Sequence, residues 1–321
     1  MRQTHYFVDG QAVDQLPNSP GVYRFYGDGP VPLYIGKSLH IARRLREHMS
    51  EAAASARHRR LMDSTQRVDC TLTAGDIGAQ LLENREIKRE LPLFNRRQRR
   101  ARHPVTLHLV DAPGGEAGFL RPEVRALSAG SLPDTGAHYG LFRQRRGAED
   151  YLIDLSRRCG LCQRVLGLDR GRGPCFAHQL GQCRGACVGR EPAAQHNQRL
   201  LAALAPAQLA AWPWPHAVLL REQAPEQGRT DWHLVDQWQH LGSFPSLRHL
   251  PRRALAASPA ALDLDAYRIL LRAFRQPDAQ LYAYRPGGKP RAVPLTSPTY
   301  SVWRAPATGS GGGAGRTRAV E

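Results

Sequence analysis

The amino-acid sequence predicts an α/β fold of the α+β kind. We expect a small module with a three-stranded antiparallel sheet flanked by helices, followed by a cysteine-rich region and a mixed C-terminal region. Two short segments rich in aromatic and β-branched residues, at 21–26 and 32–37, are separated by turn residues. A helical period of apolar residues follows, and five of the six cysteines fall together further along the chain.

Composition limits the class of protein. The 321 residues, 41% of them hydrophobic, suffice for one large domain or two small ones. A formal net charge of +17 favours a polyanionic partner, although an arginine-rich genome alone would give the same balance. The sequence has no uninterrupted apolar run of the ~18–20 residues that a membrane span needs. The first residues lack the apolar core of a signal peptide, so we expect a cytoplasmic protein.

Shifts in composition predict where the parts of the chain begin and end. After a leader over 1–15, we expect a compact module at 16–95, a basic linker at 96–102, a cysteine-rich region at 103–195, a C-terminal region at 196–304 and a disordered Gly-rich tail at 305–321. No internal repeat with a period of roughly 20–50 residues is present.

The elements of the first module follow from local patterns. The turn residues of 27–30 join the first two strand segments into a β-hairpin. From residue 39 a helical face is predicted by the spacing of Leu39, Ala42, Leu45 and Met49. Residues 67–74 form a third strand pattern. Residues 75–91 predict a second helix, which ends before Pro92 and whose apolar stripe comprises Ile77, Leu81, Ile87 and Leu91.

Several side chains of this module suit the hydrolysis of a phosphodiester. That reaction needs a positive charge to neutralise the phosphoryl oxygens, a carboxylate for a hard metal ion, and a group that activates water. The segment offers Lys37 and Arg44 as cations, Glu83 as the carboxylate at the edge of the helical stripe, and Tyr23, Tyr34 or His48 as proton acceptors.

The order of these residues resembles the GIY-YIG nuclease signature. Gly21-Val22-Tyr23 is followed by Tyr34-Ile35-Gly36-Lys37, by Arg44, and by "GAQLLENREIKRELPLFN", which is similar to the family helix that carries a metal-binding glutamate. The segment "CQRVLGLDRGRGPCFAHQLGQCRGACVG" and two Trp-containing segments further resemble the UvrC excinuclease family, in particular its short Cho-type members.

This resemblance implies an activity and a set of roles. The activity is a single cut on the 3′ side of a lesion in nucleotide excision repair, on damaged double-stranded DNA that UvrA has loaded with UvrB. It also implies induction in the SOS response. Glu83 would hold Mg²⁺ or Mn²⁺, Arg44 would stabilise the transition state, and Asn95 would hydrogen-bond within the site.

The identity of the general base is left open by the sequence. Tyr34 or Tyr23 would orient or deprotonate water, and Lys37 would help to lower the high pKa of the phenol. Many UvrC proteins have tyrosine where this chain has His48, and histidine titrates near neutrality.

The cysteines indicate a metal site. On the resemblance, Cys162, Cys175, Cys183 and Cys187 imply a [4Fe–4S] cluster. The alternatives are a zinc site of Cys159, Cys162, Cys183 and Cys187, or buried thiols without metal. We expect the cluster to be structural and to direct a loop carrying Arg164, Arg170, Arg172 and Arg184 towards DNA. Cys70 lies in a strand pattern and is expected in the core.

The basic linker predicts contact with DNA phosphates, although a solvated linker is the alternative. The expected DNA-binding residues are Arg43, Arg96, Arg97, Arg99, Arg100 and Arg102. Most of the five tryptophans are expected in the core or an interface and not stacked on bases.

Two rival functions remain at this stage. One is a different GIY-YIG endonuclease, acting in recombination or restriction. The other is a catalytically silent, metal-stapled DNA-binding protein. We expect a monomer that binds no membrane.

Overall fold

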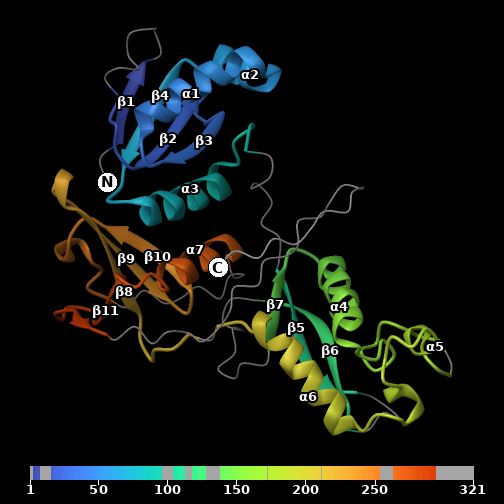
Figure 1. Ribbon diagram of the computed structural model, residues 1–321. Coiled ribbons are helices and arrows are strands. Elements are labelled where there is room, and N and C mark those ends of the chain that lie inside the picture. The colour runs from blue at the N-terminus through green and yellow to red at the C-terminus, as the bar shows by residue number, and fades with distance from the viewer. Residues whose placement is uncertain are drawn as a thin grey trace. The chain divides into compact units, whose positions relative to one another are not determined.

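The computed structural model describes residues 3–7, 16–95, 104–112, 118–127, 138–171, 173–210, 212–253 and 263–293. The described residues form two compact units (Figure 1). One unit combines those of 1–104, 126–136 and 210–299, and the other combines those of 105–125 and 137–209. Each unit is described by itself below.

The first unit begins with an antiparallel sheet. Its strands, in the order β1-β4-β2-β3, are β1 (Gln3–Phe7), β4 (Arg67–Leu72), β2 (Gly21–Tyr26) and β3 (Tyr34–Ser38). The three expected antiparallel strands are confirmed. A fourth strand, β1, forms within the segment that the sequence suggested was a leader, and it pairs with β4 along the edge of the sheet.

Helix α1 (Ile41–Ala54) covers this sheet through a face shifted from the expected one. Ile41, Ala42, Leu45 and His48 are its buried residues. Leu39, expected on the buried face, is 46% exposed because it lies before the helix, which begins at Ile41; Met49 is 40% exposed, and its neighbour His48 takes the buried position instead. Helix α2 (Ala56–Asp63) follows directly and begins where the Ser55 side chain accepts a hydrogen bond from the His58 amide.

Helix α3 (Asp76–Glu90) packs against β2 and β3, the two strands of the hairpin. Its residues Leu82 and Ile87 form a buried cluster with Val22 of β2 and Ile35 of β3. The expected stripe is wrong at Leu91, which is 50% exposed because it adopts the left-handed conformation that ends the helix before Pro92.

The later part of the first unit is a second antiparallel sheet with one helix. The strand order is β10-β9-β8-β11-β12, and the elements are β8 (Val218–Ala224), β9 (Arg229–Asp236), β10 (Gln239–Phe244), α7 (Leu264–Ala273), β11 (Gln280–Ala283) and β12 (Arg291–Ala292). Trp214, Trp232 and Trp238 are buried here, which confirms the expected core role for these three; Trp303 lies outside the described residues. Short 3₁₀ turns occur at Pro225–Gln227 and Leu247–His249.

The second unit has a three-stranded sheet against two long helices. Its elements are β5 (Val105–Asp111), β6 (Leu120–Ala126), β7 (His138–Phe142), α4 (Arg145–Cys159), α5 (Phe176–Gln179) and α6 (Ala193–Leu204), with 3₁₀ turns at Ala186–Val188 and Ala205–Ala207. Leu107, Tyr151, Leu152, Leu155 and Leu200 are among the residues of its core. Within the part of the chain that the structure describes, no helix is both long and apolar enough to cross a bilayer.

Candidate functional site

A glycine in the hairpin makes room for two phenol rings. Gly36 of β3 lies opposite Tyr23 of β2 in the strand register. A Cβ atom at Gly36 would lie 2.4 Å from the Tyr23 hydroxyl oxygen and 2.8 Å from Cε1 of Tyr34. Because no real Cβ tolerates such contacts, the glycine between the two tyrosines is required by the approach of their rings.

Behind these rings, Tyr23 is hydrogen-bonded to a buried histidine. The Tyr23 hydroxyl lies 2.7 Å from Nε2 of His48, and the two residues are each 1% exposed. Burial and the positive charge of Arg44 lower the pKa of His48 to about 4. The imidazole is therefore neutral at pH 7 and can accept a hydrogen bond from the Tyr23 hydroxyl, while burial raises the pKa of Tyr23 well above its ordinary value.

Tyr34 is the more accessible phenol of the pair. Its ring centroid lies 6.1 Å from that of Tyr23 and 5.4 Å from that of His48. Burial and the charge of Glu83 raise the pKa of Tyr34, whereas hydrogen bonding with Tyr23 and the charge of Arg44 oppose this rise. On balance the surroundings disfavour a negative charge on this oxygen, so Tyr34 stays a neutral phenol.

Glu83 of α3 points back to the same strand. Its Oε1 atom accepts a hydrogen bond from the Lys37 amide at 3.2 Å. Burial raises the pKa of Glu83 to about 7, since one amide and the Lys37 charge compensate only part of the lost hydration. A half-buried carboxylate with so little compensation fits the residue that receives a divalent cation.

The contacts of Lys37 do not match the role that the sequence predicted for it. Its Nζ atom lies 2.6 Å from Oδ1 of Asp76, and this ion pair directs the ammonium group to the start of α3. The sequence suggested that Lys37 lowers the pKa of a tyrosine, but the pKa of Tyr23 and that of Tyr34 are both raised. Lys37 instead acts on Glu83, whose pKa its amide and charge hold down.

Arg44 is held on α1 by two acidic neighbours. Its Nη1 atom donates to Glu47 at 2.8 Å and to Glu51 at 3.2 Å. Burial acts against its charge, but the bond to Glu47 and the nearby Tyr23 keep the pKa of Arg44 above its ordinary value. Arg44 therefore stays cationic at every pH at which the protein is folded.

Asn95 is hydrogen-bonded to the backbone of β3. Its Oδ1 atom accepts from the Ile35 amide at 2.9 Å, and its Nδ2 atom donates to the Ile35 carbonyl at 2.8 Å. Asn95 is 7% exposed. Both bonds hold β3 between Tyr34 and Gly36, so the contacts make Asn95 a positioning residue.

The sequence analysis missed two polar residues beside His48. One ligand atom each of His48, Glu51 and His58 lies within 4.8 Å of the others, as in a site for a metal ion. His48 and Glu51 are three residues apart on α1, which the helical period would have indicated. Two imidazoles suit borderline-soft ions, whereas Mg²⁺ prefers oxygen, so Glu83 remains the better ligand for a hard cation.

Four cysteines of the second unit lie together. The Sγ atom of Cys175 is 3.8 Å from that of Cys162 and 3.6 Å from that of Cys183, and the Cys175 amide donates to the Cys187 sulfur at 3.4 Å. Cys159 instead packs against the separate core of α4 and α6. The structure therefore groups the expected quartet and leaves Cys159, which the zinc alternative needs, outside it.

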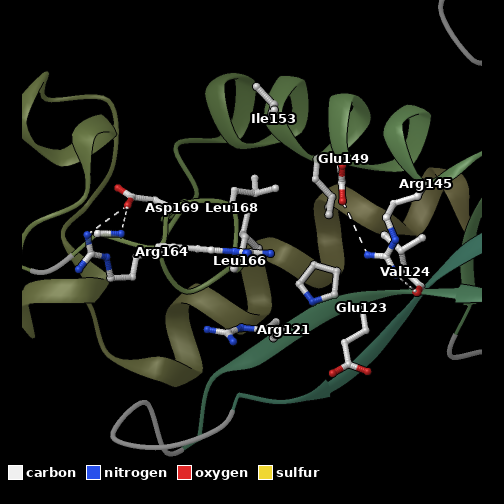
Figure 2. Close-up of a pocket in the computed structure, with 15 residues that line it drawn as sticks. Arg121, Glu123, Val124, Arg145, Glu149, Ile153, Arg164, Leu166, Leu168 and Asp169 are labelled. Carbon is white, nitrogen blue, oxygen red and sulfur yellow. Dashed lines mark hydrogen bonds and ion pairs between the residues drawn. The ribbon is translucent and has the colours of Figure 1, made fainter.

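A pocket of about 780 Å³ lies between β6, α4 and the loop after Cys162 (Figure 2). Its charged residues of both signs are Arg121, Glu123, Arg145, Glu149, Arg164, Asp169 and Arg170. Arg145 pairs with Glu149 at 3.7 Å and Arg164 with Asp169 at 3.3 Å, as the dashed lines of Figure 2 show. None of the expected catalytic residues lines this pocket.

The expected DNA-binding residues are only partly described. Arg43 is exposed on α1, where its Nε atom pairs with Glu47 at 3.1 Å. Arg96, Arg97, Arg99, Arg100 and Arg102 lie outside the described residues, and so does Arg172. Cys70 is buried in β4, as its strand pattern predicted.

Three protein-family models match the chain. Residues 19–96 match the UvrC-like GIY-YIG domain, residues 121–206 match the UvrC/Cho excinuclease middle domain, and residues 217–298 match the excinuclease Cho C-terminal domain. The three matches follow one another along most of the chain.

Similar proteins are named excinuclease cho or UvrABC system protein C. The chain is 36% identical over 288 residues to excinuclease cho of Shigella flexneri, covering 87% of this chain and 90% of that protein. It is 28% identical to UvrABC system protein C of Pectobacterium atrosepticum over 54% of this chain and 27% of that protein. The magnesium-bound GIY-YIG domain of UvrC from Thermotoga maritima is 29% identical, covers 26% of this chain and 90% of that domain, and has a TM-score of 0.24. The chain therefore belongs to the UvrC/Cho family of excinucleases, as a Cho-type, metal-dependent GIY-YIG endonuclease of DNA excision repair.

Proposed function

We propose that this protein makes a single incision on the 3′ side of a DNA lesion and that it acts on DNA already loaded with UvrB. The observation that carries the catalytic part is the placement of Glu83. Its carboxylate is largely buried and accepts a hydrogen bond from the amide of Lys37, which follows both tyrosines in the sequence. We place the reaction in the cytoplasm, where bacterial chromosomal DNA lies, under SOS control.

Glu83 is the residue that would hold the divalent cation, Mg²⁺ or Mn²⁺. Such a cation, when bound, neutralises charge on a non-bridging oxygen of the scissile phosphate. Lys37 contributes through its amide, which fixes one carboxylate oxygen and leaves the other for the metal. Arg44, always cationic, neutralises the additional charge of the transition state from helix α1.

Tyr34, Tyr23 and His48 form the proton path in this proposal. Tyr34 orients the attacking water as a neutral phenol, because it is the less buried phenol of the pair. As the water attacks, its proton passes to the Tyr34 oxygen, the Tyr34 proton to Tyr23, and the Tyr23 proton to Nε2 of His48 across the 2.7 Å contact. His48, whose pKa is about 4, holds this proton only transiently and releases it to water after the cut.

Replacing His48 tests the proton path. His48→Phe removes the acceptor while keeping an aromatic ring, and we expect a loss of incision rate of about 100-fold, the lower end for general acid–base catalysis. His48→Tyr restores a hydroxyl and should keep most of the activity. Single-turnover rates at saturating Mg²⁺ measure both. Equal rates for the two variants would remove His48 from the proton path.

The four clustered cysteines are proposed to hold a [4Fe–4S] cluster. Four thiolates suit this cluster, and Cys162, Cys175, Cys183 and Cys187 supply them within one loop region. The cluster would be structural, holding the loop with Arg164 and Arg170. The sulfur separations of 3.6–3.8 Å match thiolates on one zinc ion, whereas each thiolate of a [4Fe–4S] cluster binds a different iron, so metal content distinguishes the two.

Anaerobic purification should therefore yield a brown protein with iron and acid-labile sulfide. Cys175→Ser should lose both, whereas Cys159→Ser, the matched control, should keep them. A colourless protein with one equivalent of zinc would overturn the assignment of iron and sulfide.

The incision experiment tests the proposed function directly. Purified protein, Mg²⁺, UvrA, UvrB and a duplex with one defined lesion should give one nick, 3′ to the damage. Omission of UvrB should abolish the nick. A nick that appears equally without UvrB would indicate a different GIY-YIG endonuclease, and DNA binding without any cut would indicate a silent DNA-binding protein. Raising the salt concentration should weaken DNA binding steeply if Arg43 and the basic linker contact phosphates.

A further inference from the structure

We propose that the C-terminal sheet of this chain positions the catalytic helix α3, with Glu222 of β8 and Asp231 of β9 as the positioning residues. Glu222 accepts hydrogen bonds from two amides in the first turn of α3, and Asp231 accepts one from the loop residue Ala74 just before it. The inference rests on the proposed role of Glu83 as metal ligand. It assigns to the Cho-type C-terminal domain a role in the geometry of the nuclease site.

The start of α3 lacks a capping side chain of its own. Its N-cap residue is Gly75, and no side chain of the helix itself accepts from the first amides. Glu222 supplies the cap from another part of the chain. Its Oε1 atom accepts from the Ile77 amide at 2.8 Å, and its Oε2 atom accepts from the Gly78 amide at 2.9 Å. A carboxylate there also interacts favourably with the helix dipole.

Asp231 binds Ala74, the loop residue immediately before the N-cap of α3. Its Oδ2 atom accepts from the Ala74 amide at 2.7 Å, and Asp231 is 1% exposed. A buried carboxylate is stable only where hydrogen-bond donors compensate its lost hydration, so Asp231 needs the Ala74 amide. The buried amide of Ala74 in turn needs an acceptor, which Asp231 supplies. Arg229, also on β9, donates to the Leu72 carbonyl at 3.2 Å. The whole turn between β4 and α3 is therefore bound to β8 and β9.

Two glycines at the start of α3, one at its N-cap and one in its first turn, are explained by the approach of Glu222. A Cβ atom at Gly75 would lie 2.4 Å from Oε1 of Glu222. The φ angle of Gly75 is −173°, which is extended backbone that any residue adopts, so the space for Glu222 is the reason for the glycine. At Gly78, a Cβ atom would meet Oε2 of Glu222 and Cε1 of His233, both at 3.1 Å.

Glu222 is itself held by a buried polar network. Nε2 of His233 lies 3.2 Å from Oε2 of Glu222, and His233 is fully buried. The other ring nitrogen of His233 lies 2.8 Å from the Ser243 hydroxyl, which lies 2.9 Å from Nε2 of His240. Because these groups belong to paired strands β9 and β10, Glu222 presents its oxygens to α3 from a rigid support.

A second anchor lies on the other side of Glu83. Asn84, the next residue, donates from Nδ2 to Asp263 at 2.7 Å. Lys88 pairs with Asp263 and also with Asp265 at 3.1 Å, at the start of α7. The C-terminal elements thus hold α3 before and after Glu83, which fixes the position of its carboxylate relative to the Lys37 amide.

The experiment compares Glu222→Gln with Glu226→Gln in the full-length protein. Glutamine at 222 keeps the size but sets an amide donor against one helix amide, and Glu226 is exposed on the neighbouring turn. Glu222→Gln should raise hydrogen exchange at Ile77 and Gly78 roughly tenfold, as expected for losing a bond to a charged acceptor. It should also raise the Mg²⁺ concentration for half-maximal incision several-fold without changing DNA affinity. Glu226→Gln should change none of these.

The Mg²⁺ midpoint separates positioning from simple loss of folded protein. A smaller folded fraction lowers the rate at every Mg²⁺ concentration but leaves the midpoint unchanged, and that result would overturn the proposal. Hydrogen exchange needs no activity. If neither variant nor parent cuts DNA, the proposed function fails, while faster exchange in Glu222→Gln alone still supports the anchor, and equal exchange in both variants overturns it.

A coupled pair of substitutions gives a second test. Gly75→Ala should disturb α3 strongly in the parent, because its Cβ meets Glu222. In a Glu222→Ala background the same substitution should have little additional effect on exchange or on the Mg²⁺ midpoint. Effects that simply add would show that Gly75 and Glu222 do not act together.

Discussion

Replacing Glu83 by glutamine is expected to lower the incision rate by about 10³-fold, since a metal ion at the phosphate is worth several kcal/mol. Glutamine keeps the size of the side chain and its bond from the Lys37 amide, so the protein should stay folded. It cannot offer the negative oxygen that Mg²⁺ prefers. Single-turnover incision and thermal unfolding without metal, measured on the same preparation, test both parts.

Glu90→Gln is the matched control on the same helix. Glu90 pairs with its neighbour Arg89 at 2.6 Å on the surface of α3. This variant should cut like the parent. A Glu83→Gln protein that cuts as fast as Glu90→Gln would end the metal assignment.

The raised pKa of Glu83 predicts how the reaction depends on pH. Below its pKa of about 7, Glu83 carries a proton that a cation must displace, so the apparent Mg²⁺ affinity should fall roughly tenfold per pH unit. Above pH 7 the affinity should level off. Without metal, stability should decrease as pH rises from its ordinary pKa of 4.5 to about 7, because the unfolded chain releases this proton more readily.

A Mg²⁺ titration at several pH values checks this dependence. At saturating Mg²⁺ the acid limb of the pH–rate profile should move to lower pH, because the metal ion competes with the proton for Glu83. His48, with its pKa of about 4, adds no limb between pH 5 and 8. An acid limb that stays in place at every Mg²⁺ concentration would assign it to another group.

Replacing Glu86 by glutamine should cost about 3–5 kcal/mol of folding stability, the range for breaking a buried ion pair. Glu86 lies one turn after Glu83 and pairs with Arg24 of β2, and each is 6% exposed. Nε of Arg24 donates to Oε2 of Glu86 at 2.7 Å, and Nη1 donates to Thr71 at 3.0 Å. The substitution leaves a guanidinium buried without its counter-charge.

Urea unfolding of Glu86→Gln beside Glu90→Gln measures this cost. Replacing both partners, as Arg24→Leu with Glu86→Leu, should recover much of the stability because no charge remains unpaired. If Glu86→Gln is as stable as Glu90→Gln, the pair contributes little to the fold. The two substitutions then distinguish the roles of the two carboxylates: Glu83 is proposed to bind a cation from outside the protein, whereas Glu86 is neutralised by Arg24 within it.

Local patterns in the sequence determined the first sheet and the order of the polar residues around it. Strand alternation, the turn at 27–30 and the spacing of apolar residues each depend on near neighbours, so they predicted β2, β3, β4, α1 and α3. The glycine between Tyr34 and Lys37 was also part of the recognised signature. The helical faces were displaced because the exact start of a helix depends on its cap, as at Ile41.

Only the tertiary structure decided which polar groups meet. Tyr23 and His48 are 25 residues apart, Lys37 and Asp76 are 39 apart, and Ile77 and Glu222 are 145 apart. Such contacts arise when packed elements place side chains together, and no period in the chain encodes them. For this reason the sequence indicated the residues of the site, whereas the fold determined that His48 stays neutral, that Lys37 pairs with Asp76, and that the C-terminal sheet caps the helix of Glu83.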